Sequence, residues 1–161
     1  MKKFIIAITI TIVFGTLLVW GVSKIPVNDP ATITSREVAL TCTTDMATQF
    51  HIHPYLTIMI KGVPMVLPPD IGIRPNCMNS IHTHDSTGQV HVEAPVQKDF
   101  TLSDLFAVWR KDFSKSQILE HVADAQHEIV VTVDGKRVDT YENTLLKDGE
   151  KIVISYQEIL K

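Results

Sequence analysis

The sequence has no excess of basic residues and no run of lysine and arginine. Lys and Arg total 15 against 18 Asp and Glu, which gives a formal net charge of -3. We therefore expect no nucleic acid as a partner. The chain also lacks the glycine-rich patterns G-x-x-x-x-G-K and G-x-G-x-x-G, so no nucleotide partner is expected. The G-x-S-x-G motif of serine hydrolases is absent as well.

One stretch of the sequence is long and apolar enough to be a membrane segment. Phe4 to Val22 contains no charged residue, and its length of about 19 residues spans about 28 Å as a helix. Lys2 and Lys3 precede it, which places the N-terminus in the cytoplasm by the positive-inside rule. We predict a transmembrane signal anchor over residues 1–22. A cleaved signal peptide is the open alternative.

The residues after this segment are expected outside the cytoplasm under both alternatives. Residues 23–36 include Pro26 and Pro30 and show no apolar periodicity, which predicts a tether. Residues 37–161 have the length of one domain. We therefore expect a single-pass protein of the cell membrane, with a cytoplasmic N-terminus and an extracytoplasmic C-terminal domain.

Cysteine occurs only twice, at Cys42 and Cys77. In an exported protein an even number of cysteines usually means a disulfide. We expect these two residues to be bonded to each other. A pair of thiolate metal ligands is the alternative, although no C-x-x-C spacing is present.

Apolar patterning predicts an α+β fold that is rich in strands. Leu102, Leu105, Phe106 and Trp109 follow the i, i+3, i+4, i+7 spacing of one helix face. Alternation and turn signals predict strands, and a short second helix is expected later in the chain. The expected strands cover residues 55–60, 63–67, 81–85, 89–94, 128–133 and 151–156, and the short second helix covers 116–122.

The C-terminal half resembles the β-grasp fold, in its ubiquitin-like sulfur-carrier branch. The resemblance covers about residues 100–156 and rests on TLSDLFAVW, IVVTVDGKRV and TLLKDGEKIVISY. It implies a small β-rich domain with one main helix, into which the hairpin at 81–94 is inserted. Sulfur carriers end in a Gly-Gly tail, whereas this chain ends in Gln157 to Lys161. Carrier chemistry is therefore not implied.

Five of the seven histidines occur in three short patches with i, i+2 spacing. These patches are HIH, HTHD and HVE. In a strand, residues i and i+2 point to the same face, so each patch predicts a strand with one polar face of metal-ligand residue types. The predicted metal ligands are His51, His53, His82, His84, His91 and Glu93, with Asp85 as a neighbouring residue or further ligand.

The register of the hairpin at 81–94 decides whether its histidines share a face. If His84 pairs with Gln89, then His82 lies opposite His91 and both share a face with Glu93. A slip of one residue would move His91 to the other face, and the turn chemistry at Asp85 and Gly88 favours that slip. We predict the register that unites the histidines.

The three patches together resemble a family of exported or membrane-anchored prokaryotic proteins that carry HIH…C…HTHD…G…H.E. The resemblance covers about Cys42 to Trp109 and implies no established activity. The two histidines outside the patches, His121 and His127, are expected to be ordinary solvated side chains.

Imidazole ligands suit zinc, copper, nickel and iron. We expect one or two divalent transition-metal ions, with copper slightly favoured over zinc because nitrogen sites bind Cu(II) more tightly. In a strand, Met59 would share the face of His53, but packing is its expected role. The ion could be held for delivery, storage or sensing, with a membrane or extracytoplasmic metalloprotein as partner.

Two other functions remain open, and no catalytic residue is assigned. A small metal-dependent hydrolase or oxidoreductase could use His82, His84 and His91 as ligands, with Glu93 or Asp85 as its base. Alternatively, the domain could be a structural or interaction module whose histidines give a pH-responsive face.

Overall fold

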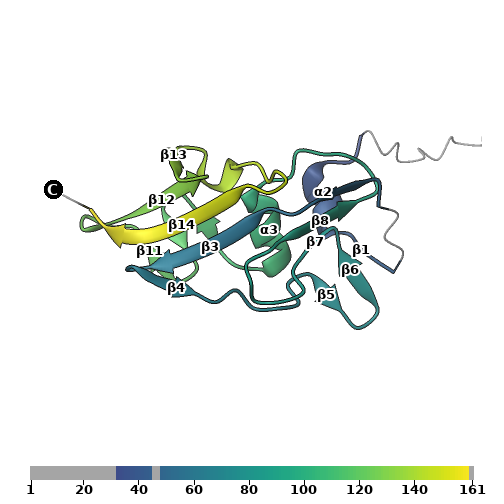
Figure 1. Cartoon of the computed structure of the whole chain (residues 1–161), viewed down its shortest axis with the longest axis horizontal. Helices are drawn as coiled ribbons and strands as arrows, with labels where there is room; N and C mark the ends of the chain where they lie inside the picture. The colour runs from purple at the N-terminus through teal and green to yellow at the C-terminus, as the bar shows by residue number, and fades with distance from the viewer. Residues whose placement is uncertain (1–31, 45–47, 160–161) are drawn as a thin grey trace, which may run out of the picture. The chain divides into compact units, whose positions relative to one another are not determined.

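A five-stranded mixed sheet forms the centre of the computed structural model, which describes residues 32–44 and 48–159. The strand order is β13-β12-β14-β3-β4, and β14 runs parallel to β3 while the other pairs are antiparallel (Figure 1). The fold is therefore α+β, as predicted. The strands are β3 (Tyr55–Ile60), β4 (Val63–Met65), β12 (His127–Val133), β13 (Lys136–Val138) and β14 (Lys151–Glu158).

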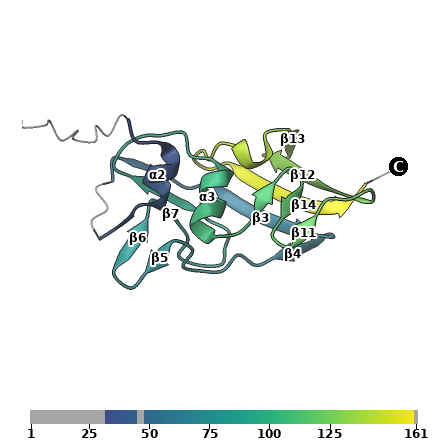
Figure 2. The same ribbon diagram turned by 180° about the vertical axis from the view of Figure 1, so that it is seen from behind.

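The main helix, α3 (Leu102–Trp109), covers one face of this sheet (Figure 2). Leu105 and Phe106 of the helix and Ile154 of β14 are buried in one apolar core. The Asp104 carboxylate accepts a hydrogen bond from the Thr101 backbone N–H at 3.0 Å, which caps the N-terminal end of the helix. A single 3₁₀ turn, η1 (Tyr141–Asn143), precedes β14.

The folded part begins earlier than the sequence predicts. Helix α2 (Ser35–Leu40) has a capping box between Thr34 and Glu37, whereas residues up to 36 were expected to be tether. Arg36 also forms an ion pair with Asp104 of α3, with Nε and Oδ1 3.1 Å apart. The helix was missed because it is too short for a periodic apolar pattern and is held by packing.

The predicted anchor at 1–22 and most of the predicted tether lie outside the described residues. Among the residues that the structure does describe, none of the helices has the length and apolar character needed to cross a bilayer.

A second, three-stranded sheet carries the histidine patches. Its order is β2 (Phe50–Ile52), β8 (His91–Ala94) and β7 (Ile81–His82). His82 pairs with His91, so the predicted register is confirmed. The strand expected at 81–85 ends at His82 because the buried Thr83 bonds outside the hairpin. Its backbone N–H donates to Ile71 O at 3.1 Å, and its hydroxyl donates to Pro68 O at 3.2 Å.

A third small sheet contains the disulfide. Its order is β1 (Cys42–Thr43), β6 (Cys77–Asn79) and β5 (Ile73–Arg74). Cys42 and Cys77 are bonded, with Cα atoms 5.4 Å apart, so the predicted pairing is confirmed and no thiolate is left for a metal.

The helix expected at 116–122 is wrong, because this segment forms short strands. These strands form a further small sheet of β9 (Phe113–Ser114), β10 (Gln117–Ile118) and β11 (His121–Val122). Ile118 pairs with Phe113 on one side and His121 on the other, and it is fully buried. Burial of Ile118 outweighs a helical preference that is weak in so short a segment.

Gly88 fixes the loop between β7 and β8 against β3. Its φ is +89°, its carbonyl accepts from Leu56 N at 2.8 Å, and an added Cβ would lie 2.6 Å from Leu56 O. Gly62 has a similar φ of +80° but no neighbouring atom within 4 Å of such a Cβ. Both alanine variants suffer backbone strain, and only Gly88→Ala adds a collision with backbone.

We expect Gly88→Ala to lower the free energy of unfolding by at least about 1 kcal/mol more than Gly62→Ala does. Urea unfolding of the two variants, followed by circular dichroism, measures the difference. Equal losses would show that the loop moves away from β3 at no cost.

Candidate metal centre

The second sheet brings all five patterned histidines to one place. His82 of β7 lies opposite His91 of β8, and His51 of β2 lies opposite Glu93 of β8. Continuing the β2–β8 register places His53 beside His91, and these two ring centroids are 4.6 Å apart. The apolar residues between them, such as Val92 and Ile81, point to the core and are fully buried.

The five histidines form two groups of three that share His91. In each group one possible ligand atom per residue lies within 4.8 Å of the others, so each group could hold a metal ion. We call them the outer trio, His51, His53 and His91, and the inner trio, His82, His84 and His91. Neither trio includes Glu93 or Asp85.

His82 is the most enclosed ligand of the inner trio. Its side chain has no exposed surface, and its Nδ1 lies 3.0 Å from the backbone oxygen of Asn79. A carbonyl only accepts, so Nδ1 carries the proton and Nε2 keeps a free lone pair. Nε2 is buried and has no hydrogen-bond partner in the part of the chain that the structure describes. This ring is oriented as a metal-bound histidine usually is, with its second nitrogen bonded to the protein.

Burial keeps His82 neutral. Loss of hydration is the main cause that lowers its pKa from 6.5 to about 4, while the Asn79 carbonyl and Glu93 oppose the shift. A neutral imidazole is the form that binds a metal. At neutral pH the inner trio therefore presents its most buried ligand ready to coordinate.

His91 occupies the centre of the cluster. Its Nδ1 is buried and has no hydrogen-bond partner within residues 32–44 and 48–159. Burial lowers its pKa, and the neighbouring His53 and His84 lower it further. The centroid of its ring lies 4.7 Å from that of His84 and 5.3 Å from that of His82.

Carboxylates lie beside the outer trio. Glu93 Oε1 is 3.1 Å from His51 Nε2 and 3.7 Å from His91 Nδ1, so Glu93 is a neighbour of the site. Asp148 Oδ1 accepts from the His53 backbone N–H at 2.8 Å and lies 3.9 Å from its Nδ1. Sequence reasoning missed Asp148, because it lies 95 residues from His53 in the chain and has no local spacing that links it to the histidine patches.

Asp85 has a local structural role. Its Oδ1 accepts from the Thr87 N–H at 2.8 Å and from the Thr87 hydroxyl at 2.6 Å. These bonds lower the pKa of Asp85 and shape the loop that follows His84. Exposed His84 and His51 form the open side of the cluster.

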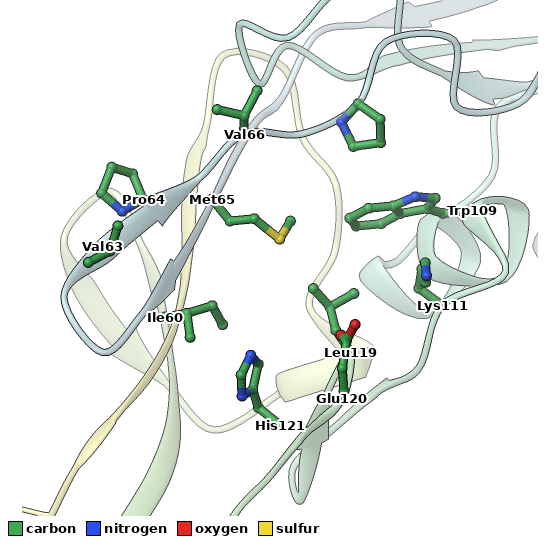
Figure 3. A pocket seen from close by; sticks show the side chains of 11 residues that line it. Ile60, Val63, Pro64, Met65, Val66, Trp109, Lys111, Leu119, Glu120 and His121 are labelled. Carbon is green, nitrogen blue, oxygen red and sulfur yellow. The ribbon is translucent and has the colours of Figure 1, made fainter.

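The two remaining histidines lie outside the cluster, but they pack against another ring and are not simply solvated as expected. The rings of His121 and His127 stack on Tyr156, with centroids 5.1 and 5.0 Å away. His127 also bonds to Asp124. His121 lines a largely apolar hollow of about 720 Å³ into which Met65 and Trp109 point (Figure 3). None of the predicted ligands is among the residues that line this hollow.

Comparisons with family models, curated proteins and solved structures find no match to this chain. The residues of the site supply five imidazoles and a nearby carboxylate, without a thiolate, and such a donor set suits a borderline transition metal.

Proposed function

We propose that the protein is a membrane-tethered, extracytoplasmic metal-binding protein that holds its ion with strand-borne histidines. The observation that carries the proposal is the buried Nε2 of His82, which has no hydrogen-bond partner among the described residues. An unsatisfied buried acceptor costs about 1–3 kcal/mol. Bound metal would supply the missing interaction.

The topology around the site supports a β-grasp-like domain. A hairpin, a helix and further strands follow in order, and the first and last strands of the main sheet, β3 and β14, are parallel neighbours at its centre. The histidine sheet adjoins this arrangement, because Tyr55 at the start of β3 forms a bridge with Gln89 and the Val90 N–H donates to Pro54 O at 2.9 Å. We propose that the insertion converts a common scaffold into a metal carrier.

Copper or zinc is the proposed ion, with copper slightly favoured. The disulfide removes both thiols, so a soft thiolate site for Cu(I) is disfavoured and nitrogen ligands remain. Nitrogen sites bind Cu(II) more tightly than Zn(II). The side chain of His51 is 46 % exposed, so an incoming ligand can reach the outer trio. This openness suits delivery to a membrane or extracytoplasmic metalloprotein by ligand exchange.

Metal affinity tests the proposal directly. The full chain, purified in detergent without a polyhistidine tag, would be titrated with Cu(II), Cu(I) and Zn(II) against competing chelators. We expect tight, saturable binding, and a loss of at least about tenfold in affinity in His82→Ala or His91→Ala, which corresponds to about 1.4 kcal/mol.

The matched control is His121→Ala, which removes an imidazole outside the cluster and should leave the affinity unchanged. Circular dichroism would establish that each variant is folded. Wild-type affinity no tighter than millimolar, or equal losses in all three variants, would refute the proposed site.

A further inference from the structure

We propose that the cluster is a dinuclear centre in which the imidazole of His91 bridges two metal ions. The outer trio holds one ion and the inner trio holds the other. This inference rests on the proposed metal-binding function and adds the number of ions and the residue that joins them.

Strand order puts His91 between the two ion positions. β8, which carries His91, is the middle strand of the sheet β2-β8-β7. His53, which follows β2, approaches from one side, and His82 on β7 approaches from the other. His51 and His53 therefore come from the β2 side of β8, and His82 and His84 come from its β7 side. An imidazole has one nitrogen for each of two such neighbours.

The ring contacts follow the same division. His51 and His53 contact each other, at 4.4 Å between centroids, and both contact His91. On the other side, His82 and His84 contact each other, at 4.8 Å, and again both contact His91. His91 is thus the common member of two otherwise separate sets. A single ion at one of its nitrogens would use one set and leave the other unoccupied.

Each trio alone supplies the ligand number of an open metal site. Three protein ligands and one further position are typical of a tetrahedral centre that is not closed by protein. In the outer trio, Glu93 lies 3.1 Å from His51 and can occupy that further position or lie beside it. In the inner trio the exposed side of His84 leaves it open to water.

A bridge uses both ring nitrogens of His91, and its buried Nδ1 has no hydrogen-bond partner among the described residues. The carboxylate oxygen of Glu93 is 3.7 Å from this nitrogen. The neutral ring carries one N–H proton, so the second ion displaces this proton to solvent and leaves an imidazolate between the ions. No electron is transferred in this step.

The test uses Cu(II) as the probe and the full chain without a tag. Copper per chain is counted by elemental analysis after unbound copper is removed, and the low-temperature paramagnetic resonance signal is integrated at each step of the titration. We expect two ions per chain, one for each trio. The integrated signal should fall below the copper count as the second ion binds, because a bridging imidazolate couples the two spins.

Paired variants separate the two positions. His51→Ala/His53→Ala and His82→Ala/His84→Ala should each halve the bound copper and restore a signal equal to the copper count. His91→Ala should abolish the coupling. His121→Ala/His127→Ala, which removes two imidazoles outside the cluster, should behave as wild type.

The outcomes distinguish this inference from the function on which it rests. One tightly bound ion per chain would overturn the dinuclear centre and leave metal binding intact. Two ions with a full, uncoupled signal would overturn the bridge through His91. Absence of tight binding would overturn both proposals.

Discussion

A chain with Cys42→Ser and Cys77→Ser is expected to be about 3–4 kcal/mol less stable than the wild type. The disulfide joins two residues that are 35 positions apart in the sequence. Cross-linking a loop of this size lowers the entropy of the unfolded chain, which destabilises the unfolded state by about that amount. For a domain of this size the melting temperature should fall by roughly 10 °C. The small sheet β1-β6-β5 has few residues to compensate for the loss.

The loss should also reach the metal centre. β6 carries Asn79, whose backbone oxygen orients His82, and whose side-chain amide donates to Ala39 O at 3.0 Å. Loosening β6 would weaken the hydrogen bond between the Asn79 backbone oxygen and the His82 ring. We therefore expect the serine variant to bind metal more weakly than the wild type at a temperature where both are folded.

Thermal unfolding with and without a thiol reductant provides the matched control. The wild type should lose stability when it is reduced, to about the level of the serine variant, and the variant should not respond to the reductant. A wild-type melting temperature that is unchanged although both thiols are shown to be free would contradict this account.

Local patterning was sufficient for the elements that bury a regular face. The alternation in KIVISY corresponds to β14, in which Ile152, Ile154 and Tyr156 are buried on one side. The helical spacing from Leu102 to Trp109 corresponds to α3. Local patterning failed at 116–122, where the decisive contact is the pairing of Ile118 with Phe113. A tertiary contact of one residue leaves no period in the sequence.

The sequence predicted which residues form the candidate metal centre better than it predicted how they are arranged. The i, i+2 spacing identified the five histidines, and the demand for a common face selected the correct pairing of His82 with His91. The pairing of β2 with β8 spans about 40 residues of chain and is set by packing of the whole domain, as with Ile52 against Val92. The division into two trios depends on that pairing, so spacing alone does not reveal it.

Metal-free wild-type protein is expected to lose stability in mild acid, and His82→Leu should remove much of that loss. The pKa of His82 is about 4 in the folded state and about 6.5 in an unfolded chain. Between these values the unfolded chain binds a proton that the native protein does not, so the free energy of unfolding falls as the pH falls. Titration of His82 therefore lowers the free energy of unfolding by about 3 kcal/mol in total. This loss is nearly complete near pH 4 and absent above about pH 7.

Urea unfolding in the presence of a chelator, at several values between about pH 7 and about pH 4, measures this difference. Leucine occupies the buried position without a titrating group, although it gives up the bond to the Asn79 carbonyl. That loss should shift the variant's curve by a constant amount and leave its slope with pH shallower than that of the wild type. Parallel curves would mean that His82 is hydrated and titrates normally in the folded chain.

Metal binding should raise the free energy of unfolding, whereas protonation in acid lowers it. An ion that binds the native state alone stabilises it, and coordination at Nε2 of His82 would occupy the atom that otherwise has no partner. We therefore expect wild-type protein saturated with Cu(II) or Zn(II) to be more resistant to urea than metal-free protein near pH 7, with no such gain in His82→Leu/His91→Leu. The buried, partnerless imidazole would then be a cost to the metal-free fold that binding of the ion offsets. If metal stabilised the double variant as strongly as the wild type, the stabilising ion would have to bind outside the cluster.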